Sequence, residues 1–202
     1  VRIRIIENQE NLGISGATNR GIENALGLFI ALMDQDDISL PERFEKEVNF
    51  LEKHSSIAAV SGNSITIKQD GEYRVRPPVF ETPGLIRWGL LFRNQIQNSA
   101  AMIRRSVIFK HAIRYESFSP AQDYRFWVQL CHKEKIANLA EPLLYHRLHN
   151  LNASDILQNN FYNSTYKIRK DLVYKCLNWK ISDSMINGLL SPEKITNIGD
   201  AN

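Results

Sequence analysis

Six consecutive apolar residues, Leu28 to Met33, are followed at once by the acidic cluster Asp34-Gln35-Asp36-Asp37. A short, continuously apolar run is typical of a strand buried on both faces, as in the central parallel strands of an α/β sheet. In open α/β sheets, ligands bind in the crevice beyond the carboxyl ends of the strands. The sequence therefore places three carboxylates where a ligand is expected.

Strand-like and helix-like segments alternate along the chain, which predicts an α/β fold with a mixed sheet flanked by helices. Asp70-Gly71 between two further strand-like segments is a hairpin signal. Ser39 and Pro41 predict the N-cap and first position of a helix, and Gly27 predicts the end of the helix before it. We expect strands over residues 1–5, 28–33, 57–60, 63–68, 72–76, 99–104 and 143–148. We expect helices over residues 17–26, 39–54, 83–92 and 122–133.

The 202-residue length suits one domain with an appendage. After residue 154 the composition shifts toward Asn, Lys, Tyr and Ser, with apolar residues spaced for one or two helices. We therefore predict a catalytic domain over residues 1–154 and a helical C-terminal extension over residues 155–202.

Charge, hydropathy and cysteine usage exclude several other classes. A net charge of +3 is too small for the basic stripe of a nucleic-acid-binding protein, so we expect no nucleic-acid partner. The longest apolar stretch, Leu26 to Met33, is far shorter than the roughly 20 residues that span a bilayer. Cys131 and Cys176 are too far apart in sequence for a common metal-binding motif.

The chain resembles the family 2 glycosyltransferases, which are inverting nucleotide-sugar enzymes of the GT-A fold. The similarity begins with Asn11-Leu-Gly-Ile-Ser-Gly-Ala-Thr-Asn-Arg-Gly-Ile22 and continues through the acidic cluster to Leu40-Pro-Glu-Arg43. It includes Gln122-Asp-Tyr-Arg-Phe-Trp-Val-Gln-Leu130, where the family usually has Glu before the Asp, and ends at Tyr145-His-Arg-Leu-His149. A lone Asp-x-Asp would be weak, but the order and spacing of these segments are specific.

The resemblance implies a role for each matching residue. Asp123 matches the general base that deprotonates the acceptor hydroxyl, and Asp34 would orient the donor. Three further residues would hold Mn²⁺ or Mg²⁺ at the donor diphosphate: Asp36, Asp37 and His149. Asn19 and Arg20 would contact the nucleotide from a glycine-rich loop, although Thr18 replaces the family's Arg.

Structural explanations of the same residues stay open. The acidic cluster could be a solvated loop at the start of the next helix, and Asp123 could cap the helix that carries Trp127. His149 could be a structural residue of the sheet. Ser99 is expected in the core rather than in an acceptor pocket, and His146 is expected at the surface. Because Gln122 carries no charge, the pKa of Asp123 is expected to be lower than it would be beside a Glu.

The opening strands of the family pattern have no match, because Val1 to Glu7 resembles the strand just before the first motif. We expect that the chain is N-terminally truncated and that its sheet has an uncovered apolar edge, which favours a homodimer.

The resulting prediction is a metal-dependent inverting transferase. It would move a sugar from a nucleotide-diphosphate donor to a hydroxyl of a glycan or lipid-linked acceptor in surface polysaccharide synthesis. We expect a cytoplasmic protein whose only membrane contact is peripheral, at the inner face. The alternative is a noncatalytic glycan-binding remnant of such an enzyme. A nucleotidyltransferase is less favoured, because no glycine-rich phosphate loop of its type is visible.

Overall fold

The computed structural model describes residues 3–77, 79–117, 120–148, 158–177 and 182–190. In this part of the chain, six strands form one mixed sheet in the order β1-β5-β3-β6-β2, and β4 pairs with β3 beside this path. Only β3 and β6 run parallel; the other pairs are antiparallel. The strands are β1 (Phe29–Ala31), β2 (Ile38–Ser39), β3 (Ile57–Ile67), β4 (Tyr73–Val75), β5 (Met102–Arg104) and β6 (Lys135–Arg147).

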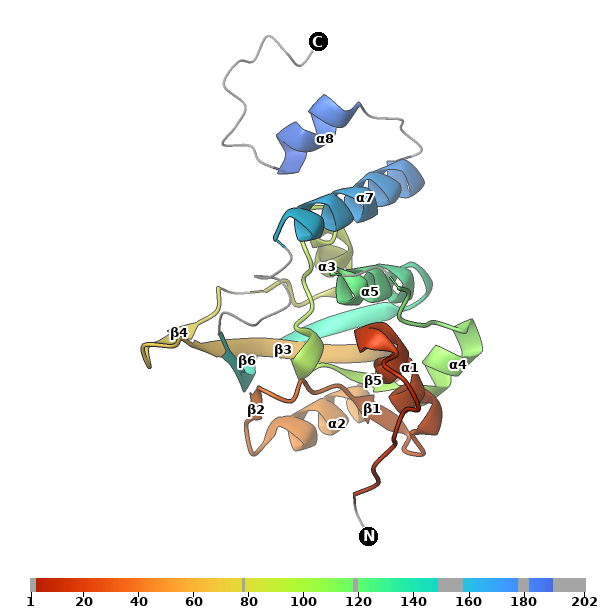
Figure 1. Cartoon of the computed structure of the whole chain (residues 1–202), viewed down its shortest axis with the longest axis vertical. Helices are drawn as coiled ribbons and strands as arrows, with labels where there is room; N and C mark the ends of the chain where they lie inside the picture. The colour runs from red at the N-terminus through yellow and green to blue at the C-terminus, as the bar shows by residue number, and fades with distance from the viewer. Residues whose placement is uncertain (1–2, 78, 118–119, 149–157, 178–181, 191–202) are drawn as a thin grey trace.

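Helices cover both faces of the sheet (Figure 1). Helix α2 lies on one face, and α3, α5 and α7 lie on the other, with α1 and α4 at the β1/β5 end. The helices are α1 (Gly13–Asn24), α2 (Arg43–Lys53), α3 (Pro83–Gly89), the 3₁₀ turn η1 (Asn98–Ala100), α4 (Arg105–His111), α5 (Gln122–Lys133), α7 (Gln158–Leu177) and α8 (Asp183–Leu190). This arrangement is the predicted α/β architecture, and the bounds of α5 match the prediction.

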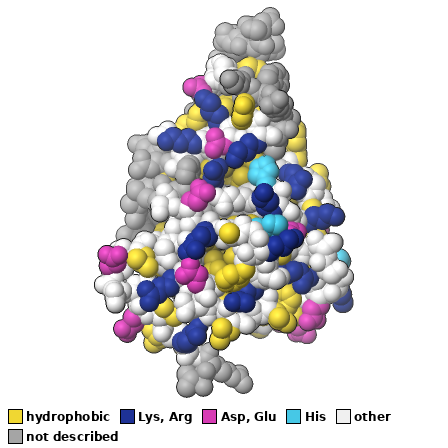
Figure 2. All heavy atoms as spheres, turned by 90° about the vertical axis from the view of Figure 1, so that its right-hand side faces the viewer, with side chains coloured by type: hydrophobic (Ala, Val, Ile, Leu, Met, Phe, Trp, Pro, Cys, Tyr) yellow, Lys and Arg dark blue, Asp and Glu magenta, His cyan; other side chains and the backbone are white. Residues whose placement is uncertain are grey.

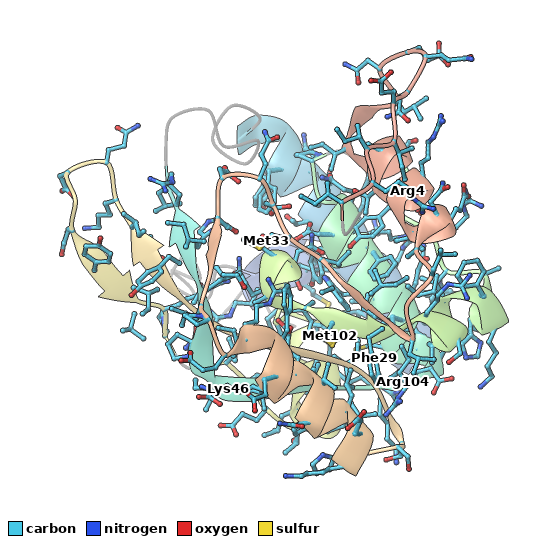
Figure 3. The ribbon with its side chains drawn as sticks, turned by 90° about the horizontal axis from the view of Figure 1, so that it is seen from below. Arg4, Phe29, Met33, Lys46, Met102 and Arg104 are labelled. Carbon is cyan, nitrogen blue, oxygen red and sulfur yellow. The ribbon has the colours of Figure 1, made fainter. Side chains whose placement is uncertain are left out.

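Two hydrophobic cores, one on each face, follow from the alternation of side chains along the strands. Ala59 and Ile103 point into the larger core, which contains Trp127 of α5. Their neighbours Val60 and Met102 point into the smaller core against α2. Figure 3 shows Phe29 of β1 next to Arg104 of β5, whose guanidinium lies 5.5 Å from the ring centroid.

Tertiary context changed several predicted elements in the first forty residues. Ile3 and Ile5 are 78% and 82% exposed and form no strand, because no described strand lies beside them to complete a hydrogen-bonded ladder. The segment expected to be a loop from Gly13 is already helix α1, which ends at Asn24 before Gly27.

The apolar run after Gly27 was predicted to be a buried parallel strand, and this was wrong. Strand β1 has only three residues, pairs antiparallel with β5 and lies at the end of the described sheet. Leu28 is 84% exposed. Continuous apolar sequence predicts a strand but does not say which neighbour it has.

The predicted start of α2 was also wrong. Ser39 belongs to β2, Glu42 is the N-cap, and the apolar side chain of Phe44 is exposed. The helix instead buries Arg43 and Glu47 completely.

The later elements agree better with the predictions. The hairpin at Asp70-Gly71 is confirmed, with Gly71 at φ +83°, but β3 is one continuous strand instead of two. The last strand, β6, starts eight residues earlier than Leu143. Gly62 lies where β3 and β6 shift register, and a Cβ there would stand 2.5 Å from the Leu143 side chain. Only glycine allows this close approach.

Helix α7 contributes Ile168 and Leu172 to the larger core, where it packs on α5. The division at residues 154 and 155 stays a prediction, since residues 149–157 lie outside the described part. No helix in the described part of the chain has both the length and the apolar character needed to cross a bilayer.

The face formed by α1 and α4 carries scattered Lys and Arg side chains with Asp and Glu among them (Figure 2). Two of the ion pairs near these helices are Lys110 with Glu134 and Arg114 with Glu23. A hollow of about 160 Å³ between α1 and α4 is lined largely by apolar side chains, including Ile22 and Ile108. Apart from Asn19, it contains none of the predicted site residues.

Candidate functional site

The acidic loop after β1 is tied to the end of β6 through Asp37. Its buried Oδ1 accepts hydrogen bonds from Nδ1 of His146 and the main-chain N–H of Arg147, both at 3.1 Å. Arg147 Nε also donates to the carbonyl of Asp36 at 3.1 Å. His146 was predicted to be a surface residue, but it is partly buried against Asp37. The parallel β3–β6 pairing brings His146 here, from 109 positions along the chain.

The electrostatics of Asp37 favour its ionised form. Burial alone would raise its pKa, but the hydrogen bonds from His146 and from the Arg147 main chain outweigh that effect, so the pKa of Asp37 is lowered. Asp37 is therefore a carboxylate at neutral pH. The repulsion expected from three neighbouring acids is relieved here by partners from another strand.

A buried ion pair supports the same loop from the α2 side. Arg43 Nε lies 3.2 Å from Glu47 Oε2, and both side chains have no solvent exposure. Arg43 Nη2 donates to the carbonyl of Leu32 at 2.8 Å, and Nη1 lies 3.2 Å from Met33 Sδ. Met33 is on the chain that leaves β1 (Figure 3). Burial raises the pKa of Glu47 to about 7, against the opposing influence of Arg43.

Asp34 and the η1 turn form the next part of the site. Ser99 Oγ donates to Asp34 Oδ2 at 2.5 Å. Asn98 Oδ1 accepts a 2.8 Å hydrogen bond from the hydroxyl of Tyr115. Ser99 is buried, as predicted, but it contacts an acidic side chain of the loop rather than the apolar core alone. Asp34 itself is exposed to solvent.

Asp123 lies in the first turn of α5, where its Oδ2 accepts a 3.0 Å hydrogen bond from Asn94 Nδ2. Burial raises its pKa, and the nearby charge of Asp34 acts in the same direction. Hydrogen bonds from the main chain at Asp123 and Tyr124 and from Asn94 oppose the rise. The predicted difference between a Gln and a Glu neighbour stays a prediction, since burial is the main cause of the raised pKa of Asp123. The interpretation of Asp123 as the helix cap was wrong, because Ala121 is the N-cap and no side chain caps this helix.

Asp34 and Asp123 share one electrostatic neighbourhood although they are 89 residues apart in sequence. Besides the effect of Asp34 on Asp123, both carboxylates raise the pKa of Tyr115, whose main cause of elevation is burial. The end of the acidic loop, the η1 turn and the start of α5 therefore face a common region. A pair of carboxylates in different environments, one of them with a raised pKa, is the arrangement that acid–base chemistry requires.

Asn19 and Arg20 lie on helix α1 rather than on the predicted loop. Asn19 bonds the main chain of Tyr115 at both ends of its amide: Nδ2 donates to the carbonyl at 2.8 Å, and Oδ1 accepts from the N–H at 2.9 Å. These two hydrogen bonds fix the main chain of Tyr115 beside the site. The nucleotide-binding role of Asn19 and Arg20 stays a prediction.

One buried carboxylate oxygen of the acidic loop has no hydrogen-bond partner among the described residues. Asp37 Oδ2 is buried and makes no hydrogen bond to any described residue, although Oδ1 makes two. No three His, Cys, Asp or Glu side chains are grouped for metal binding within the described residues. His149, the third predicted ligand, lies outside them. The carboxylates present fit a hard divalent cation, which prefers oxygen ligands.

Sequence reasoning did not find several residues of this site. Arg43, Asn94, Asn98 and Tyr115 all contact it or support it. The signals were weak: Arg43 appeared as an ordinary polar helix residue, and nothing local relates Tyr115 to Asn19.

Comparisons with known proteins agree with this geometry. The profile described as "Glycosyl transferase family 2" matches residues 1–110, more than half of the chain. An uncharacterized glycosyltransferase of Haemophilus influenzae is 30% identical over 187 residues, which cover 88% of this chain and 58% of that protein. The amylovoran biosynthesis glycosyltransferase AmsE of Erwinia amylovora is 26% identical over 69% of this chain and 52% of that protein. The chain thus spans about half the length of these curated relatives.

One solved structure shows the fold. The mannosyltransferase PcManGT of Pyrobaculum calidifontis, in complex with GDP-Man and Mn²⁺, superposes with a TM-score of 0.54 at 11% identity. The superposition covers 94% of this chain and 51% of that one. At this identity the likeness concerns the architecture alone.

Proposed function

Because this chain belongs to glycosyl transferase family 2, we propose that it transfers a sugar from a nucleotide-diphosphate donor to a hydroxyl acceptor, with inversion at the anomeric carbon. The observation that carries the proposal is the shared neighbourhood of Asp34 and Asp123. A direct displacement needs the donor on one side and a base on the other. The acidic loop and the start of α5 supply these two sides. The relative AmsE, named for amylovoran biosynthesis, supports a polysaccharide as the product.

Asp123 is the proposed general base. Its raised pKa makes it a better proton acceptor than an ordinary Asp, since base strength follows the pKa. The amide of Asn94 holds one carboxylate oxygen, Oδ2, and so fixes the orientation of the carboxylate. In the transfer, the hydroxyl oxygen forms the new bond to the anomeric carbon, its proton passes to Asp123, and the bond to the diphosphate breaks.

Asp34 orients the donor, and Ser99 fixes the Asp34 carboxylate. Asp36 and Asp37, with His149, would hold Mn²⁺ or Mg²⁺, for which the unused Oδ2 of Asp37 is the local support. When bound, such a cation stabilises negative charge on the departing diphosphate. The neighbour solved with GDP-Man and Mn²⁺ supports both the donor class and the metal.

The decisive experiment compares turnover and donor binding in the Asp123→Asn variant. We expect kcat to fall by about 10²–10⁴-fold, the usual worth of a general base, while the Kd of the donor changes less than threefold. Asp171→Asn is the matched control, since Asp171 pairs with Arg125 on the helical side of the molecule. Wild-type turnover in Asp123→Asn would refute the assignment.

A second measurement tests the donor side. Calorimetry with Mn²⁺ and a nucleoside diphosphate, UDP or GDP, should show that Asp36→Ala loses metal-dependent binding. Unchanged affinity would remove the metal role. NMR of the product gives the anomeric configuration, and retention would overturn the inverting mechanism. A protein that binds glycans but no nucleotide under any condition would be the noncatalytic remnant.

A further inference from the structure

Arg76 is within electrostatic reach of Asp123 and is held in place at both its main chain and its side chain. Its N–H donates to the carbonyl of Ser64 at 3.0 Å, and its own carbonyl accepts from Asn63 Nδ2 at 3.1 Å. Its Nη1 donates to Gln97 Oε1, and the carbonyl of Gln97 accepts a 2.9 Å bond from Ser61 Oγ. This exposed arginine is therefore oriented by three strand residues and a glutamine, although it follows the end of β4.

Arg93 lies in the segment that contains Gln97, the partner of Arg76. It immediately precedes Asn94, which bonds Asp123, and it lies four residues before Gln97, which bonds Arg76. The segment from residue 93 to residue 97 thus joins both arginines to the proposed base. Within the described residues, no carboxylate forms an ion pair with either guanidinium.

Electrostatics place the three charges in one neighbourhood. The pKa of Arg76 is lowered first by partial burial and then by the like charge of Arg93, while Asp123 raises it. Two guanidiniums that repel each other beside one partly buried carboxylate form a region with excess positive charge. An anion bound there would relieve the repulsion, and paired arginines match the geometry of phosphate or carboxylate oxygens.

From this juxtaposition we propose that Arg76 and Arg93 form a subsite for an anionic group of the acceptor, a phosphate or carboxylate close to the hydroxyl that Asp123 deprotonates. The inference rests on the proposed function for the identity of the bound molecule. The acceptor is favoured over the donor diphosphate because the hydrogen bonds of Gln97 and Asn94 tie the 93–97 segment to Arg76 and to Asp123. The acidic loop has His146 and Arg147 as its own partners. An anion here also raises the pKa of Asp123, which strengthens the base.

The test is calorimetric binding of glucose 6-phosphate and glucose to the purified protein. Wild-type protein should bind the phosphorylated sugar at least tenfold more tightly. Arg76→Gln and Arg93→Gln should each abolish that preference, and Arg76→Lys and Arg93→Lys should retain part of it. Arg74→Gln is the matched control, because Arg74 is also exposed and belongs to the same strand, β4, but no ion pair or side-chain bond links it to Asp123 or the 93–97 loop. Thermal melts of all variants report whether each is folded.

A repeat of the titration with saturating UDP or GDP separates the two sources of the anion. Binding of glucose 6-phosphate that persists beside the nucleotide supports an acceptor subsite. Competition would show that the arginines hold the donor diphosphate and would overturn the proposal, as would equal binding of the two sugars or an equal loss in Arg74→Gln. If neither nucleotide binds while the arginine-dependent preference remains, the proposed donor chemistry fails and the anion subsite stands.

Discussion

The two sides of the proposed site, the acidic loop and the start of α5, hold their carboxylates in opposite ways. The acidic loop anchors Asp37 with an imidazole and a main-chain N–H, so its pKa is lowered and its charge contributes to folding. The start of α5 holds Asp123 with a neutral amide in a partly buried position, so its pKa is raised and its charge is costly. Stability therefore depends on an ionised loop, while reactivity depends on a carboxylate that the fold does not favour. Proteins often accept such strain at functional positions.

The largest effect is expected from breaking the buried Arg43–Glu47 ion pair that supports the acidic loop. Arg43→Met should lower the free energy of unfolding by about 3–5 kcal/mol, because it leaves Glu47 as an unpaired buried charge and the Leu32 carbonyl without its donor. Urea unfolding followed by circular dichroism measures the change. The double variant Arg43→Met/Glu47→Leu should recover most of the loss. A single variant as stable as the wild type would show that the pair does not support the loop.

Glu47→Gln should change the pH dependence of the free energy of unfolding, because Glu47 belongs to the same buried pair. A carboxyl whose pKa is raised on folding stabilises the protein below its ordinary pKa of 4.5, and this contribution is lost as the pH rises through about 7. The free energy of unfolding of the variant should therefore increase relative to that of the wild type between pH 5 and pH 8, by up to about 3 kcal/mol. Unfolding curves at four pH values measure this gain. Glu45→Gln, on the exposed side of α2, should show no such trend.

Asp37→Asn addresses the loop carboxylate itself. We expect a loss of about 1–3 kcal/mol at pH 7, since the His146 and Arg147 hydrogen bonds lose their charged acceptor. The pKa of Asp37 is lowered from 3.8, so its contribution is present above that pH and disappears as the pH falls through the folded value. The gap between variant and wild type should narrow in acid. A gap that is constant from pH 7 to pH 3 would contradict the assignment.

The smallest effect is expected at the start of α5, where a substitution should increase stability rather than decrease it. Asp123→Asn should raise the free energy of unfolding slightly at pH 7 while it lowers turnover strongly. The wild-type carboxyl stabilises the fold below pH 3.8 and loses that contribution as the pH rises through its raised folded pKa. The gain should therefore vanish in acid. If Asp37→Asn and Asp123→Asn changed stability in the same direction, the contrast between the two sides would be wrong.

Motif order and local pattern were enough to predict the α/β class, the hairpin at Asp70-Gly71 and the exact bounds of α5. They also predicted one site for Asp34 and Asp123, whose charges influence each other in the structure. They failed at β1, where an apolar run suggested a central strand but the neighbours place it at the end of the described sheet. They failed again at α2, where two charged residues are buried because each neutralises the other.

The sequence by itself determined the family motifs, and with them the residues predicted to carry the chemistry, because the identity and spacing of these residues are local properties of the chain. Only the tertiary structure decided their electrostatic states. His146 reaches Asp37 through the parallel pairing of β3 with β6, and Asn94 reaches Asp123 across 29 residues. A pKa depends on burial and on charges brought close in space, and no short stretch of sequence determines either of these.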